Sequence, residues 1–188
     1  MARELVIRRA VEADVPALLH LQSRSVRELG RRDYTVEQID AFLDHIGTMD
    51  PQLVSDRTYF LAEIGGQVVG CGGWTYREHN YEDAVLPPGL ALSLIDSDAM
   101  TAYVRAVFVH PDWVRCGVAS RIMQRTEADI EAEGFQRIRL LATLTGVPLY
   151  QKLGYRIEDR AYLRAPNDIL VPGVSMRKEL AQPHSRAS

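Results

Sequence analysis

The segment from Val107 to Ala119, which reads VFVHPDWVRCGVA, constrains the fold of this chain more than any other. An apolar run typical of a strand ends before Pro111, a short polar turn follows, and Gly117 stands at the start of an amphipathic helical pattern. A strand, a loop and a helix start therefore follow one another directly. This order places the first backbone N–H groups of the helix, which have no partner within the helix, beside the end of the strand.

Such a helix start favours an anionic ligand, because its unpaired N–H groups and the positive end of the helix dipole act on the same point. Gly117 allows a ligand to approach the backbone closely. The helix that follows has an apolar stripe, which would anchor the loop to a sheet, at Ala119, Ile122, Met123, Thr126 and Ile130. A glycine turn on its own is more often a plain connection, and the interpretation therefore depends on its neighbours.

The rest of the chain consists of segments with a strand-like or a helix-like pattern. We expect strands at 4–9, 59–64, 68–74, 102–109, 135–142, 156–163 and 173–177. We expect helices at 14–30, 35–46, 118–133 and around 145–153. The Gly65-Gly66 dipeptide predicts a tight hairpin turn, and the stretch 77–101 breaks the regularity as an insertion.

The strand at 102–109, the helix at 118–133 and the strand at 135–142 form a β-α-β unit, whose strands must pair in parallel. Combined with the hairpin, this order predicts the α+β class with a partly parallel sheet. The chain has no internal repeat, low-complexity tract or linker-like segment. We therefore expect one domain over residues 4–180 and a disordered tail at 181–188.

Composition excludes several classes of protein. With 188 residues, of which 46% are hydrophobic, one domain can bury a full core without cross-links. The net charge of -3 leaves no basic excess for nucleic acid, and the two cysteines, Cys71 and Cys116, form neither a disulfide framework nor a zinc site. Met1 to Ala10 does not read as a signal peptide, and no apolar stretch is long enough to span a membrane. We expect a soluble cytoplasmic protein without metal, nucleic acid or membrane as partners.

Two motifs carry a resemblance to a known family. Val114 to Ala119 matches the pattern [Q/R]-x-x-G-x-[G/A] that follows a strand ending in V-x-P, and Leu149 to Tyr155, about thirty residues on, matches Y-x-K-x-G-[F/Y]. In this order they resemble the GCN5-related N-acetyltransferase (GNAT) family, most firmly over Ala102 to Tyr155. Val114 departs from the Gln or Arg usual at its position, so that a side-chain contact there is lost or supplied by Arg115.

The resemblance implies a GNAT-like fold, that is, a central mixed, mostly antiparallel sheet that contains a splayed parallel strand pair and is flanked by helices. It implies an acyltransferase that moves an acetyl group from acetyl-coenzyme A to a primary amine of a small molecule or peptide by direct attack. The coenzyme would lie on the splayed strand, the loop and one lysine, that is, on Val107, Phe108, Val109, Val114, Arg115, Cys116, Gly117, Val118, Ala119, Ser120 and Lys152. Dimers are common in the family, so a homodimer is compatible with it. The alternative is a non-catalytic acyl-coenzyme-A-binding regulatory module with the same fold.

The resemblance also assigns catalytic roles by position. Tyr150 corresponds to the general acid that protonates or hydrogen-bonds the departing thiolate, although a tyrosine here could equally be an ordinary packed aromatic residue. A backbone donor near Val107 or Phe108 would stabilise the oxyanion that develops during acyl transfer. The loop lacks the G-K-[S/T] ending of a nucleotide hydrolase, which excludes that class.

The sequence defines the residues that would bind and deprotonate the acceptor amine less well. Glu78 and His79, in the insertion, are weak candidates for the general base. His110 ranks below them, because a histidine beside such a turn is more often a surface residue than a base. Three aromatic residues fall in regions that line the acceptor pocket in this family, although core or rim packing suits them as well, namely Tyr34, Trp74 and Tyr76.

Overall fold

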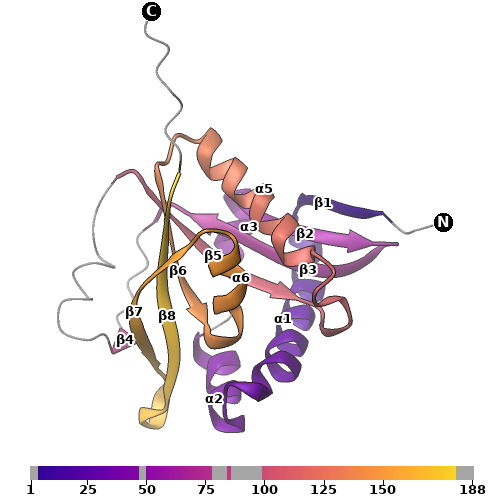
Figure 1. Ribbon diagram of the computed structural model, residues 1–188. Helices are drawn as coiled ribbons and strands as arrows, with labels where there is room; N and C mark the ends of the chain where they lie inside the picture. The colour runs from indigo at the N-terminus through magenta and orange to yellow at the C-terminus, as the bar shows by residue number, and fades with distance from the viewer. Residues whose placement is uncertain (1–3, 47–49, 78–83, 86–98, 181–188) are drawn as a thin grey trace, which may run out of the picture.

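The structure of the chain is a computed structural model that describes residues 4–46, 50–77, 84–85 and 99–180 (Figure 1). The strands are β1 (Leu5–Arg9), β2 (Tyr59–Ile64), β3 (Gln67–Thr75), β4 (Ala84–Val85), β5 (Thr101–Val109), β6 (Arg137–Thr143), β7 (Arg156–Arg164) and β8 (Leu170–Glu179). The helices are α1 (Val15–Leu29), α2 (Val36–Ala41), α3 (Pro51–Ser55), α5 (Val118–Ala132) and α6 (Val147–Lys152). Most of the predicted insertion and the predicted tail at 181–188 lie outside the described residues.

The described strands form one mixed eight-stranded sheet in the order β1-β2-β3-β5-β6-β8-β7-β4. Neighbouring strands are antiparallel except β5 and β6, which are parallel. The predicted α+β class, the mostly antiparallel sheet and the parallel pair joined by a helix are confirmed. The order also places β8 between β6 and β7, so that the last strand lies inside the sheet although it ends the described chain.

The parallel pair is short. Only Thr101–Tyr103 of β5 pairs with Arg137–Arg139 of β6, and beyond these residues the two strands diverge. On its other edge β5 bulges against β3, where Ala106 takes a positive φ of 51°. The hydroxyl of Tyr59 donates a hydrogen bond of 2.7 Å to the Ala106 carbonyl and holds this bulge. The result is a wedge-shaped opening in the middle of the sheet, as the splayed pair requires.

Helices cover both faces of the sheet. Side chains of β2 alternate, with Phe60 and Ala62 in the core beneath α5 and Tyr59 and Leu61 in the core beneath α1 and α3. Helix α6 lies on the α5 face, beside the divergent end of β6 (Figure 1). None of the described helices is long and apolar enough to cross a lipid bilayer.

The predicted cap of α2 and the predicted glycine turn of the hairpin are both present in the structure. Thr35 caps α2 in a capping box, in which its Oγ1 accepts from the Gln38 N–H and Gln38 Oε1 accepts from the Thr35 N–H. Gly65 and Gly66 turn the β2–β3 hairpin with φ values of 58° and 81°. The sequence pattern missed α3, a helix of five residues capped by Asp50, because one turn is too short to show a period.

Two glycines of β3 determine how closely α5 approaches the sheet. A Cβ atom on Gly70 would lie 2.6 Å from Val118 Cγ1 and 2.8 Å from Ile122 Cδ1. On Gly72 it would lie 2.9 Å from Val107 Cγ2 and 3.0 Å from Ile122 Cγ2. The first turns of α5 therefore sit directly on the backbone of β3, which positions the helix start beside the end of β5.

Gly70→Ala should lower the free energy of unfolding by about 1–3 kcal/mol, because the added methyl group overpacks the contact with α5. Urea denaturation of the variant and the parent protein measures this loss. Val118→Ala vacates the same space, so the double variant should lose less than the sum of the two single variants. Strict additivity of the two losses would show that the Gly70 contact does not control the approach of α5.

Candidate functional site

Two cavities open where β5 and β6 diverge. The first, of about 600 Å³, lies between the two strands, the turn after α2 and the start of β8, and is called the β8 cavity here. The second, of about 820 Å³, lies between the end of α1, the end of β5, the first turn of α5 and α6, and is called the α5 cavity. The cavities meet in the wedge, since they share the lining residues Tyr34, Phe42, Val107, Phe108, Thr143, Tyr150 and Val171.

The start of α5 opens onto the α5 cavity. Gly117 is the N-cap, with φ 82° and ψ 0°, and among the described residues no side chain caps the helix. The first N–H bonded within the helix is that of Arg121, which donates to the Gly117 carbonyl at 3.0 Å. The N–H groups before it belong to Gly117–Ser120, all of which line the cavity. A helix start of this kind binds anions.

The charged residues of the α5 cavity all have one sign. Arg32, Arg115 and Lys152 line it, and no aspartate or glutamate of the described chain does. None of these three cations forms an ion pair with another described residue, whereas the neighbouring Arg27 is paired with Asp40 at 2.6 Å. The cavity therefore has a positive field suited to a ligand with several negative charges.

The edge of β5 that faces the wedge is available to a ligand. Beyond Tyr103 this edge is not paired with β6, and Val107–Val109 line the α5 cavity. A strand presents N–H and C=O groups along each edge, and buried groups of this kind require partners. An extended ligand can therefore bond to β5 as an additional strand would.

Sequence comparison decides the family. A family model described as an acetyltransferase (GNAT) domain matches residues 55–157, more than half of the chain. The chain belongs to the GNAT acetyltransferase family. No curated protein sequence gives a significant match to the chain.

Solved structures of GNAT proteins share the fold. A GCN5-related N-acetyltransferase from Rhodopseudomonas palustris matches with a TM-score of 0.70 at 18% identity, over 96% of this chain and 98% of that chain. The PaiA N-acetyltransferase from Thermoplasma acidophilum, solved in complex with coenzyme A, matches with 0.63 at 13% identity, over 94% and 99%. The ribosomal-protein-S18-alanine N-acetyltransferase from Escherichia coli matches with 0.61 at 13% identity, over 98% and 99%.

Tyr150 of this GNAT domain lies at the junction of the two cavities. It is 7% exposed, and its ring packs edge-on against Tyr155 at 5.7 Å between centroids. Burial raises its pKa well above the usual range, and its hydroxyl makes no hydrogen bond to a described residue. The residue is thus packed in the core and lines both cavities with its hydroxyl protonated at neutral pH.

Tyr34 lines both cavities, but its hydroxyl is already engaged. It donates to the Pro172 carbonyl at 2.9 Å and accepts from the Leu144 N–H at 2.7 Å. Burial raises its pKa to about 12, against the opposing effect of the Leu144 hydrogen bond. Tyr34 therefore ties the α1–α2 turn to the ends of β6 and β8, and its ring forms part of the cavity wall.

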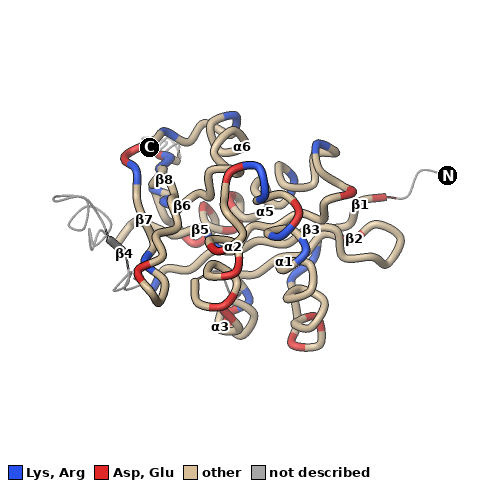
Figure 2. Tube along the Cα trace, turned by 90° about the horizontal axis from the view of Figure 1, so that it is seen from below, with Lys and Arg blue, Asp and Glu red and all other residues tan. Residues whose placement is uncertain are grey.

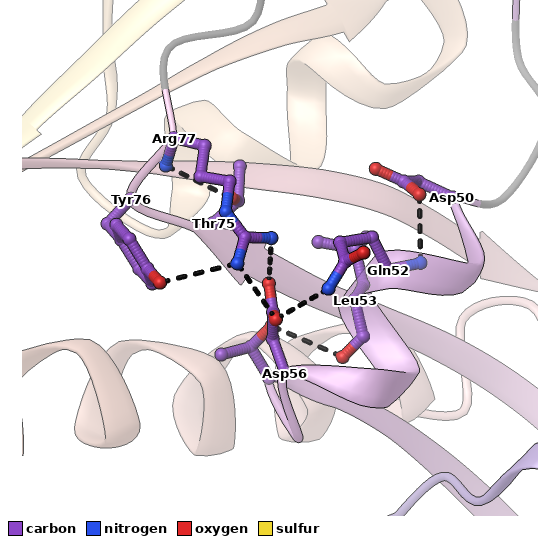
Figure 3. A network of polar contacts seen from close by, with 8 residues as sticks. Asp50, Gln52, Leu53, Asp56, Thr75, Tyr76 and Arg77 are labelled. Atoms are coloured by element: carbon purple, nitrogen blue, oxygen red, sulfur yellow. Dashed lines mark hydrogen bonds and ion pairs between the residues drawn. The ribbon is translucent and has the colours of Figure 1, made fainter.

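Two residues predicted for the acceptor pocket lie elsewhere. Trp74 is 2% exposed, and its Nε1 donates to Asp129 Oδ2 at 2.9 Å beneath α5. Tyr76 is on the surface beside Arg77, which is paired with Asp56 after α3 (Figure 3). Neither lines the two cavities formed by the described residues. The reason is topological, because β3 occupies the edge of β5 opposite to the wedge.

The predicted base candidates Glu78 and His79 lie outside the described residues. His110, expected at the surface, is 6% exposed instead, because α1 packs over it and brings Arg24 Nη1 to 2.8 Å from its Nε2. Two titratable residues that the sequence did not single out, His45 and Asp50, line the β8 cavity. His45 lies in the turn after α2 and Asp50 caps α3, so only tertiary packing brings them to the cavity, and no motif marks them.

The predicted coenzyme-binding residues gather at one place. All of them except Cys116 line the α5 cavity, although they come from β5, the loop, α5 and α6. Cys116 is exposed, with its Sγ 3.5 Å from the Val114 carbonyl oxygen. Val114 contributes apolar surface at the position of the family's Gln or Arg.

Proposed function

We propose that this GNAT domain is an N-acetyltransferase that transfers an acetyl group from acetyl-coenzyme A to a primary amine of a small molecule or peptide. The observation that carries the proposal is the junction of the two cavities at Tyr150 and the open edge of β5. One cavity suits a polyanionic donor and the other a separate acceptor, and both open on the same few atoms. Such an arrangement favours direct transfer between two bound substrates.

The α5 cavity fits coenzyme A in charge and in shape. The diphosphate would lie on the N–H groups of Gly117–Ser120, and Arg115 and Lys152 line the same cavity and would pair with its charge. The pantetheine arm is a linear chain with amide groups, and it would bond to the open edge of β5 at Val107–Val109. The thioester would then reach the junction beside Tyr150.

The β8 cavity would hold the acceptor amine. Its described wall mixes apolar residues, among them Phe42, Ile46 and Leu163, with the charged or titratable residues His45, Asp50, Arg105 and Arg164. An amine is protonated at neutral pH and must lose a proton before it attacks. His45 and Asp50 are the described groups placed to receive that proton, either directly or through water.

Transfer requires one bond to form and one to break. The amine nitrogen bonds to the thioester carbonyl carbon, and backbone N–H groups of β5 at the wedge stabilise the charge on the oxygen. The carbon–sulfur bond then breaks, and the thiolate leaves toward Tyr150. Because burial raises the pKa of Tyr150, its hydroxyl acts as a hydrogen-bond donor to the thiolate, and solvent completes the protonation.

The direct test is thiol release from acetyl-coenzyme A with purified protein and a panel of polyamines, aminoglycosides, amino acids and peptides. At least one amine class should release coenzyme A together with an acetylated product, identified by mass spectrometry. Coenzyme binding without turnover on any amine would favour the non-catalytic regulatory module. Absence of coenzyme binding would reject both functions.

Tyr150→Phe should lower kcat about 10- to 100-fold, as for the loss of one hydrogen bond to the departing thiolate, and leave the affinity for coenzyme A nearly unchanged. The matched control is Tyr155→Phe, since Tyr155 contacts Tyr150 but lines neither cavity. Because the pKa of Tyr150 is raised, activity should also show no decline from its ionisation up to about pH 10. Equal turnover of the two variants would remove Tyr150 from the mechanism.

Gly117→Glu should weaken coenzyme A binding about 100-fold or more, since it places a carboxylate in the anion site. Gly134→Glu is the matched control, because Gly134 follows the other end of α5 with φ 89° and, like Gly117, has no atom within 4 Å of an added Cβ. Both variants place a non-glycine residue at a positive φ and carry the same kind of backbone strain. A difference between their Kd values for coenzyme A, measured by isothermal titration calorimetry, therefore reports the charge at the anion site and not the strain. Similar weakening in both would argue against phosphate binding at the start of α5.

A further inference from the structure

We propose that Arg32, in the turn between α1 and α2, is a phosphate ligand of coenzyme A that faces the start of α5 from the opposite wall of the α5 cavity. The assignment rests on the proposed function and adds a contact from a part of the chain that neither sequence motif includes. It is carried by the position of α1, by the charges around Arg32 and by the turn in which Arg32 lies.

The first step is the position of α1. Arg24 of this helix lies 2.8 Å from His110 Nε2 and 3.8 Å from Asp112 Oδ2, in the turn that follows β5. These contacts hold α1 against the segment that leads into the phosphate-binding loop. The later turns of the same helix, at Val26 and Leu29, therefore form a wall of the α5 cavity.

The second step is the charge balance of this wall. Arg24 is paired with Glu28 at 2.8 Å, and Arg27 is paired with Asp40 at 2.6 Å. Arg32 has no ion-pair partner among the described residues, and it borders a cavity without a described carboxylate. A cation left unpaired beside a cavity with no acid is suited to an anion supplied by the ligand.

The third step is the rigidity of the turn. Residues Gly30–Arg32 form one 3₁₀ turn, closed by hydrogen bonds from the N–H groups of Asp33 and Tyr34 to the Gly30 carbonyl at 2.9 and 3.0 Å. The hydroxyl of Tyr34 ties the next residues to β6 and β8. The backbone of Arg32 is thus fixed, and its guanidinium fork can pair with two phosphate oxygens.

The three cations of the cavity come from three separate elements. Arg115 belongs to the loop before α5, Lys152 ends α6, and Arg32 follows α1. Coenzyme A carries a diphosphate and a 3′-phosphate, more charge than one helix start can neutralise. Val114, which is 38% exposed beside the helix start, supplies no charge. Arg32 therefore completes the cationic lining from the side that the loop cannot reach.

The test compares Arg32→Gln with Arg31→Gln, because Arg31 lies in the same turn and is exposed like Arg32, but lines neither cavity. Calorimetry would measure the Kd of each variant for coenzyme A, 3′-dephospho-coenzyme A and pantetheine at low and high salt. Arg32→Gln should weaken coenzyme A binding about three- to tenfold, as for one charged contact at a partly exposed site, with a shallower salt dependence. Pantetheine binding should not change, and Arg31→Gln should behave as the parent protein.

Several outcomes would overturn the assignment. If Arg32→Gln binds coenzyme A as tightly as Arg31→Gln, or weakens pantetheine equally, Arg32 does not bind a phosphate. Arg32→Lys keeps the charge but not the fork, so its affinity should lie between those of the parent protein and Arg32→Gln, and binding weaker than that of Arg32→Gln would indicate a structural role instead. Absence of coenzyme A binding by the parent protein overturns the proposed function itself, whereas normal binding with an unaffected Arg32→Gln variant overturns only this inference.

Discussion

The early end of the pairing between β5 and β6 is the constraint on which the site depends. Only residues up to Tyr103 and Arg139 pair, and the bulge at Ala106 keeps the rest of β5 turned away from β6. An opening in the middle of a sheet leaves backbone N–H and C=O groups without strand partners, which is costly in a dry interior. Such an opening suits a protein whose ligand supplies the missing partners.

The packing around the wedge keeps it open. Helix α5 rests on the glycines of β3, and its last turns are held by Asp129, which accepts from Trp74 Nε1 and pairs with Arg9 at 2.6 Å. On the other side, Tyr34 bridges the ends of β6 and β8 through its hydroxyl. The helix start and the two strand ends are therefore fixed by the core, so the site is preorganised.

The α5 cavity differs in charge from the chain as a whole. The whole chain is slightly acidic, and its basic and acidic residues are spread along the fold (Figure 2). Many of its arginines are paired with carboxylates on the surface. In the α5 cavity the pattern reverses, with three cations and no acid among the described lining residues. A field confined to one concave site attracts a polyanionic coenzyme without making the protein a general polyanion binder.

Local sequence patterns predicted the parts whose residues are adjacent along the chain: the β-α-β unit, the Gly117 loop at the start of α5, the β2–β3 hairpin and the tyrosine segment of α6. These follow from local patterns, since periodicity, turn residues and helix starts need only a few neighbouring residues. The folded structure was needed to show that β8 enters between β6 and β7, that Trp74 faces Asp129, and that Arg32, His45 and Asp50 border the cavities. Those positions depend on how distant segments pack against one another, and a single sequence carries no local signal for such packing.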